Sequence, residues 1–166
     1  KTKGLVKKIG VSVYGNEQFQ EAARDERIDL IQFPYNLLDN FSQRGENIRK
    51  AKEAGKELHV RSVFLQGLFF MEESKIPEKI KPLKPWLKEI HEIAKEAEMS
   101  VQELAMSYVL QNSSIDKVLI GVDSQEQLES NIDIVTKMKN IPFKTLKQID
   151  QLDVMEVELL SPVNWK

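Results

Sequence analysis

The sequence predicts an α/β fold in which parallel strands alternate with helices. Short β-rich runs recur along the chain, and amphipathic helical patterns separate them. None of the runs alternates cleanly between apolar and polar residues, which is typical of strands covered on both faces in parallel sheets. Strands that alternate with helices form right-handed parallel βαβ units. No linker interrupts the alternation, so we expect one domain over residues 1–166.

Four runs of strand length are expected to form the sheet, at residues 8–13, 28–33, 58–63 and 117–122. The long irregular stretch at 66–85 contains three prolines and is expected to be a loop after the third strand. Within it, the apolar run 64–71 (FLQGLFFM) would be costly if exposed, so we expect it to line a pocket or cover an interface.

Helical patterns fill the gaps between these runs. Apolar residues at three- and four-residue spacing predict two helices among the first three strands and two more before the fourth. Gly55 is a suitable C-cap for the second helix. Three capping boxes predict where later helices begin: Ser100 with Glu103, Ser124 with Gln127, and Thr145 with Gln148.

Composition excludes several classes of function. The chain is 41% apolar and 30% charged with a net charge of −2, so it gives no reason to expect nucleic acid or a membrane surface as partner. It has no cysteine, which excludes disulfides, thiolate zinc sites and thiol nucleophiles and fits a cytoplasmic location. No apolar run reaches the roughly 20 residues of a membrane span. Without an initiating Met or a signal peptide, we expect the chain to begin inside a larger reading frame or after processing.

Motifs at the ends of the four strands occur in a fixed order. They are IGVS at 9–12, QFPYN at 32–36, RSVFLQG at 61–67, and IG at 120–121 followed by SQEQLESN at 124–131. Each is weak alone, but together they resemble the fifth to eighth strands of the aldo-keto reductases. The resemblance implies a partial (half) TIM-type (β/α) barrel, with four parallel strands and flanking helices, that binds NAD(P).

The resemblance also implies which residues contact the dinucleotide. The implied nicotinamide contacts are Ser12, Gln32 and Arg61, the implied pyrophosphate contacts are Ser62, Phe64 and Gln66, and the implied contacts at the adenosine end are Gly121, Val122, Asp123, Gln127 and Asn131. General principles agree with this layout. Ligands of α/β barrels bind at the carboxyl ends of strands, an amide offers both a donor and an acceptor to a carboxamide, and a helix that begins near Ser124 favours an anion.

Each of these residues also has a purely structural interpretation. Gln32 could bond a neighbouring loop, Ser12 and Ser62 could end their strands, and Arg61 could pair with an acid. Gln127 is already explained as the capping partner of Ser124, Asn131 could lie on a polar helix face, and Asp123 could be solvated. The family pattern favours cofactor contact for Gln32 and Ser62, leaves both interpretations open for Ser12, Arg61 and Asn131, and does not favour it for Gln127 or Asp123.

Two departures from the family pattern concern the cofactor. Val13 replaces the usual Asn beside Ser12. Members that prefer NADPH commonly place cations at the positions of Gly121 and Gln127, and neither is cationic here. Because a charge-assisted bond to phosphate contributes roughly 1.5–3 kcal/mol, we expect a mild preference for NAD(H), or dual use.

A larger departure concerns catalysis. The family's catalytic Tyr, its Asp and Lys supporters and its His come from the first four strands, and His59 and His91 do not match that histidine. We therefore expect the cofactor-binding half of an NAD(P)-dependent carbonyl or aldehyde oxidoreductase, inactive alone. The alternatives are a non-catalytic nucleotide- or protein-binding half-barrel module and a purely structural half barrel.

Four parallel strands do not close a barrel and leave unpaired edges. We therefore expect a complex with the missing N-terminal half, a homodimer of half barrels, or a rearranged open sheet.

Overall fold

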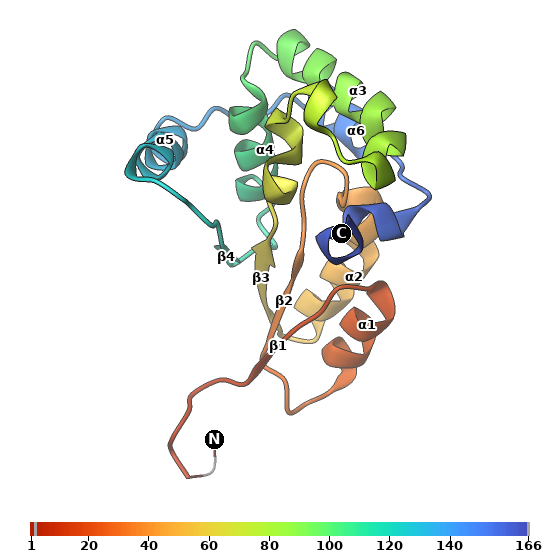
Figure 1. Ribbon diagram of the computed structural model, residues 1–166. Coiled ribbons are helices and arrows are strands. Elements are labelled where there is room, and N and C mark those ends of the chain that lie inside the picture. The colour runs from red at the N-terminus through yellow and green to blue at the C-terminus, as the bar shows by residue number, and fades with distance from the viewer. Residues whose placement is uncertain (2, 166) are drawn as a thin grey trace.

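The computed structural model describes residues 1 and 3–165, and its centre is a parallel sheet (Figure 1). The strands are β1 (Gly10–Ser12), β2 (Leu30–Pro34), β3 (Glu57–Arg61) and β4 (Lys117–Val118), hydrogen-bonded in that order. All neighbouring pairs are parallel, as the sequence predicted. The strands are shorter than the predicted runs. After Val118 the chain leaves the sheet, and one more ladder bond joins Leu119 N to Val60 O at 2.8 Å.

The predicted helices are present: α1 (Asn16–Arg24), α2 (Phe41–Glu53), α3 (Lys84–Glu96), α4 (Val101–Leu110), α5 (Gln125–Thr136) and α6 (Phe143–Asp150). In Figure 1, α1 and α2 lie side by side against one side of the sheet, while α3, α4 and α6 gather beyond the carboxyl ends of the strands. The 66–85 loop contains three short 3-10 helices, η1 (Leu65–Phe70), η2 (Glu73–Lys75) and η3 (Glu78–Leu83). Two more, η4 (Val157–Leu160) and η5 (Pro162–Trp165), end the described chain.

Helices cover only one face of the sheet. Ile31, Phe33, Leu58 and Val60 point to the α1–α2 side and are fully buried. The opposite face, which we call the open face, carries Ser12, Gln32, Glu57, His59 and Arg61 and is partly exposed. The expectation of strands covered on both faces is therefore wrong for these residues, because nothing in the described chain packs on the open face.

Helix ends confirm two of the capping predictions and correct the others. Ser100 and Glu103 form a reciprocal capping box at α4, and Gly55 adopts φ +73° directly after α2. Ser124 caps α5 by accepting from Gln127 N, but the Gln127 side chain accepts from Asp123 N instead of closing the box. The Thr145 prediction is wrong, because α6 begins at Phe143 and Thr145 is buried inside it.

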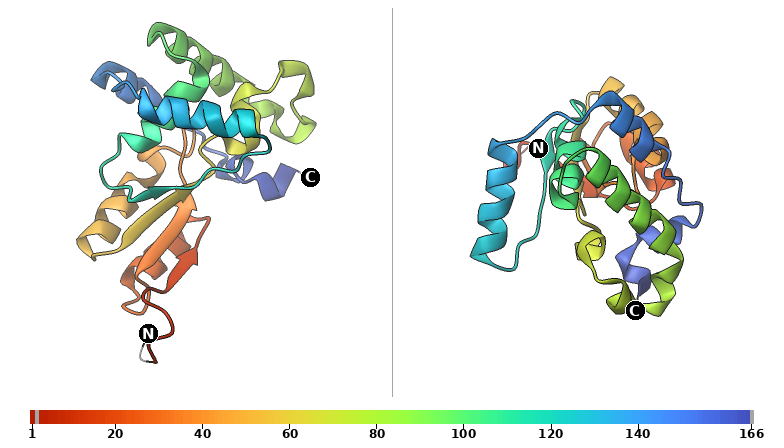
Figure 2. Two further views of the ribbon diagram at one scale, coloured as in Figure 1. Left: turned by 90° about the vertical axis from the view of Figure 1, so that its left-hand side faces the viewer. Right: turned by 90° about the horizontal axis from the view of Figure 1, so that it is seen from above.

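Helix α5 lies at the periphery of the molecule, where it contacts α4 (Figures 1 and 2). Its apolar residues Leu128, Ile132 and Val135 are 47%, 53% and 49% exposed. These three residues form what we call the α5 stripe, and the described chain leaves it uncovered. Among the described residues, no helix combines the length and apolar character needed to span a membrane.

Candidate functional site

The carboxyl ends of β1 and β2 bring two predicted residues into contact. Ser12 and Gln32 are direct neighbours in the parallel register. Ser12 Oγ donates to Gln32 Oε1 at 3.2 Å, which fixes the orientation of the glutamine amide. The Gln32 Nε2 group then remains a donor on the open face, where it can reach a ligand's carbonyl oxygen.

Arg61 lies at the end of β3, opposite Pro34 and two residues beyond the level of the Ser12–Gln32 pair. Its Nη1 donates to Ser62 Oγ at 3.2 Å and its Nη2 donates to Val13 O at 3.3 Å. Its guanidinium also lies 4.3 Å from the centre of the Tyr14 ring, a cation–π geometry. No direct ion pair joins Arg61 to an acid of the described residues, although its charge helps to lower the pKa of Asp39 against the effect of burial. The sequence had assigned Tyr14 no role, and its position two residues after Ser12 was the available signal.

The loop after β3 adopts an unusual backbone. Ser62, Leu65, Gln66 and Gly67 have φ of +61°, +45°, +53° and +78°. Only Gly67 occupies this region without steric cost, so the other three residues store strain. Three bonds hold the turn: Leu65 N donates to Ser62 O, Gly67 N to Phe64 O, and Asn36 Nδ2 to Ser62 O. Strained loops at strand ends are typical of ligand sites.

This loop, the segment after β4 and helices α4 and α5 enclose a cavity of about 560 Å³, which we call the site cavity. The predicted residues that line it are Ser62, Phe64, Gln66, Gly121, Asp123, Gln127 and Asn131. Val122 does not line it and is 40% exposed. Val63, Gly67, Phe70 and Ile120, which belong to the predicted motifs and to the 64–71 run without an individual role, also line it, as do Leu119 and Gln102. Gln102 comes from α4, so no local pattern pointed to it.

The start of α5 supplies an anion-compatible end to the site cavity. Ser124 Oγ accepts from Gln127 N at 3.3 Å, and Gln127 Oε1 accepts from Asp123 N at 2.9 Å. The Gln127 side chain therefore shapes the turn, which supports its structural interpretation even though it also lines the cavity. The pKa of the Glu126 carboxyl is lowered by hydrogen bonds from the Ser124 side chain and from its own backbone. This direction is expected for an acid at the positive end of a helix.

The FLQGLFFM run divides between core and cavity. Leu65, Leu68 and Phe69 are fully buried in the core. Phe64 and Phe70 pack against each other with ring centres 5.4 Å apart, and both line the site cavity. The expectation that the whole run lines a pocket or an interface is therefore correct for part of it only.

Neither histidine lines the site cavity, although His59 is the register neighbour of Gln32 on the open face. His59 Nε2 lies 2.7 Å from Glu57 Oε1, one layer below Arg61 on the open face. Hydrogen bonds from Lys8 and His59 lower the pKa of Glu57 to about 2. His91 lies on α3, with Nε2 3.2 Å from Phe69 O. No group of His, Asp or Glu within residues 1 and 3–165 could hold a metal ion.

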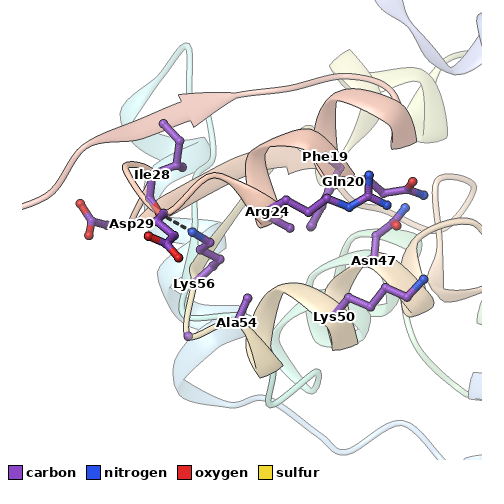
Figure 3. A pocket seen from close by; sticks show the side chains of 12 residues that line it. Phe19, Gln20, Arg24, Ile28, Asp29, Asn47, Lys50, Ala54 and Lys56 are labelled. Atoms are coloured by element: carbon purple, nitrogen blue, oxygen red, sulfur yellow. Dashed lines mark hydrogen bonds between the residues drawn. The ribbon is translucent and has the colours of Figure 1, made fainter.

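A second cavity, of about 580 Å³, lies between α1 and α2 near the amino ends of the strands (Figure 3). Figure 3 shows Gln20, Arg24, Asn47 and Lys50 along the groove between the two helices. The buried Lys56 ammonium donates to the backbone oxygens of Asp25 and Ile28 at 2.7 and 2.6 Å. Lys56 thus satisfies two backbone carbonyls that lie beyond the end of α1. None of the predicted site residues lines this second cavity.

The model of the aldo/keto reductase family matches residues 1–154. The chain belongs to this family.

Two curated enzymes resemble the chain over most of its length. L-glyceraldehyde 3-phosphate reductase of Escherichia coli K12 is 28% identical over 169 residues, covering 86% of this chain and 48% of that protein. Pyridoxal 4-dehydrogenase of Microbacterium luteolum is 26% identical over 136 residues, covering 78% and 40%. The chain thus spans about half the length of the curated relatives it matches.

Solved aldo-keto reductases share the fold. The apo form of aldo-keto reductase AKR11C1 from Bacillus halodurans superimposes with a TM-score of 0.73 at 20% identity, covering 92% of this chain and 53% of that one. Its holo form gives 0.72. These matches confirm the α/β fold with four parallel strands and flanking helices. The aldo-keto reductases are oxidoreductases that bind nicotinamide cofactors, and the residues here fit such a cofactor: an oriented carboxamide partner lies beside a strained loop and a cavity that ends at a helix N-terminus.

Proposed function

We propose that this chain is the cofactor-binding half of an NAD(P)-dependent carbonyl or aldehyde oxidoreductase. The observation that carries the proposal is the site cavity, because residues from two distant motifs, 61–67 and 120–131, line it together. The Ser12–Gln32 pair supplies the adjoining nicotinamide contact. When bound, the cofactor supplies the hydride. The protein's residues orient the carboxamide and hold the phosphates on the loop after β3 and the start of α5.

The proposed cofactor preference is for NAD(H). The described residues that line the site cavity include one charged side chain, Asp123, and no cation. A 2′-phosphate would therefore meet a carboxylate and no charge-assisted donor. Gly121 offers a clean test, because a Cβ built there meets no atom within 4 Å. Gly121→Lys should strengthen NADPH binding relative to NADH by roughly tenfold or more, since one charge-assisted bond contributes about 1.5–3 kcal/mol.

We propose that the 166-residue chain does not reduce a carbonyl by itself. The chain has three tyrosines. Tyr35 and Tyr108 are buried and bonded to each other at 3.2 Å, and burial raises the pKa of Tyr35 to about 12. Neither can donate a proton to a substrate at the strand ends. The Tyr14 ring is engaged by Arg61.

The decisive experiment is a titration of the purified chain with NADH and NADPH, followed by fluorescence and calorimetry, with a carbonyl reduction assay in parallel. Saturable binding without turnover supports the proposal. Turnover by the chain alone would contradict its inactivity. Failure to bind either dinucleotide would contradict the cofactor role and leave the structural half barrel.

We further propose that another polypeptide segment closes the sheet, either an N-terminal half or a second copy. The exposed α5 stripe supports this, because Leu128, Ile132 and Val135 form an apolar surface at one-turn spacing that nothing in the described chain covers. Size-exclusion chromatography with light scattering distinguishes a dimer from a monomer. A folded monomer whose mass does not change with concentration would remove the homodimer.

We also infer a single domain over residues 1–166 and a cytoplasmic location. The buried core cluster includes residues from Val13 to Leu160, which supports one domain. The absence of cysteine fits a reducing compartment. Limited proteolysis tests the first proposal, and fractionation of cells that express the chain tests the second.

A further inference from the structure

Two side-chain amides from different helices meet at one wall of the site cavity. Gln102 lies in the first turn of α4 and Asn131 lies in α5, and both line the cavity. Gln102 Nε2 donates to Asn131 Oδ1 at 3.0 Å and to Ser130 Oγ at 3.2 Å. An amide nitrogen carries two hydrogens, so these two bonds use both of them. Gln102 Oε1 accepts in return from Ser130 Oγ at 3.5 Å.

This contact decides which end of the Asn131 amide is available. Asn131 is 8% exposed, and its Oδ1 is turned toward Gln102. Its Nδ2 donates to no acceptor within residues 1 and 3–165. The only fully buried side-chain polar atom without a partner in the described part of the chain is Ser107 Oγ, so Asn131 Nδ2 is accessible. The residue is held in place by burial while this donor stays open at the wall of the site cavity, so it is free to donate to a bound ligand.

We propose that Gln102 is a positioning residue that fixes the Asn131 amide with its NH₂ group toward the site cavity, so that the site offers a donor to the purine base of the dinucleotide. The inference rests on the proposed function and adds that the site presents a hydrogen-bond donor to the base. A donor at this point pairs with the ring nitrogens of adenine or hypoxanthine and with the carbonyl oxygen of hypoxanthine. It cannot pair with the amino group of adenine. The wild-type site therefore tolerates either base.

A reversal of polarity tests the proposal. A carboxylate only accepts hydrogen bonds, so Gln102→Glu must turn Asn131 Nδ2 toward residue 102 and present Oδ1 to the base. An added acid in the first turn is compatible with α4. Gln125→Glu is the matched control, because Gln125 lies in the first turn of α5, is exposed and does not line the cavity. The ligands are NADH and reduced nicotinamide hypoxanthine dinucleotide, titrated against each full-length variant.

We expect wild type and Gln125→Glu to bind the two dinucleotides with dissociation constants within about threefold of each other. Gln102→Glu should bind the hypoxanthine form about tenfold more weakly than NADH, because Oδ1 then faces a carbonyl oxygen. If Gln102→Glu fails to fold by circular dichroism, Gln102→Leu replaces it. That variant frees the amide and should shift the ratio in the same direction by about threefold.

Three outcomes overturn the proposal. An unchanged ratio in the Gln102 variant that folds, with NADH still bound, removes the role of Gln102 and leaves the proposed function intact. If Gln125→Glu changes the ratio of the two dissociation constants as much as Gln102→Glu does, the effect comes from the added negative charge and not from the position of the Asn131 amide. Failure of wild type to bind NADH removes the proposed function, and this inference falls with it.

Discussion

A buried ion pair between Arg44 and Asp39 holds the loop after β1 against α2. Arg44 Nε lies 2.6 Å from Asp39 Oδ1, Nη2 lies 2.8 Å from Oδ2, and the two side chains are 8% and 5% exposed. Arg44 also donates to Tyr14 O at 2.7 Å and to Asn16 Oδ1 at 2.8 Å. One guanidinium therefore fixes both α2 and the residues that follow Ser12.

Arg44→Leu should destabilise the fold strongly. It leaves Asp39 buried without its cation, and breaking a buried pair in this way costs about 3–5 kcal/mol of unfolding free energy. Arg49→Leu is the control on the same helix, because its pair with Glu53 is exposed on both sides. Pairs of that kind contribute about 0.3–0.5 kcal/mol. Urea denaturation followed by circular dichroism at neutral pH measures both variants.

The loss in Arg44→Leu should depend on pH. Burial raises the pKa of Asp39 in the folded protein, and its bonds and charge interaction with Arg44 oppose that rise. Without Arg44 the pKa of Asp39 in the folded protein rises further above its unfolded value. The protonated form of Asp39 then favours the fold, so stability is lost as pH rises through the folded pKa. The deficit should be smaller at about pH 5 than at about pH 8. A deficit equal to that of Arg49→Leu, or one that grows on acidification, would refute the reasoning.

Three further predictions test other parts of the structure. Ser100→Ala removes the cap of α4, where Glu103 N donates to Ser100 Oγ at 3.1 Å, and should cost about 1 kcal/mol in urea denaturation; an unchanged midpoint contradicts the capping role. The pKa of Glu57 in the folded protein is lowered from 4.5 to about 2, so its ionised form stabilises the fold. This stabilisation is complete above the unfolded pKa and is lost as pH falls toward the folded pKa. Glu57→Gln should therefore flatten the acid limb of stability against pH, and an identical slope in both proteins counts against the ion-pair account. Gly67→Ala should cost about 1 kcal/mol from the backbone strain that it introduces, since φ is +78° and a Cβ there meets no atom within 4 Å; a variant as stable as wild type would exclude a left-handed backbone at residue 67.

The sequence predicted the fold well wherever periodicity and motif order coincided. The four strands, their parallel pairing and the six helices follow from short apolar runs separated by amphipathic patterns. Boundaries were less predictable. Thr145 with Gln148 has the spacing of a capping box, yet α6 begins at Phe143, because Thr145 is buried by tertiary packing that a local pattern does not contain.

Several of the predicted site residues lie close together in the structure. Motif residues such as Ser62, Gly121 and Asn131 line one cavity, and Ser12 contacts Gln32. Gln102 and Tyr14 were missed for different reasons. Gln102 reaches the site only because α4 packs beside α5, and Tyr14 gains its role from a ring contact with Arg61 across the sheet. Both contacts join residues far apart in sequence, and no local spacing reveals them.

The charges of the open face restrict what can cover it. Lys8 and Lys117 flank Glu57 in one ion-pair cluster, and Arg61 adds a third cation at the strand end. Two identical copies pressed together through this face would set cations against cations, whereas a surface rich in aspartate or glutamate would be attracted. We therefore expect the open face to favour an unlike, acidic surface over a second copy of itself, and a rise in ionic strength should weaken that preference.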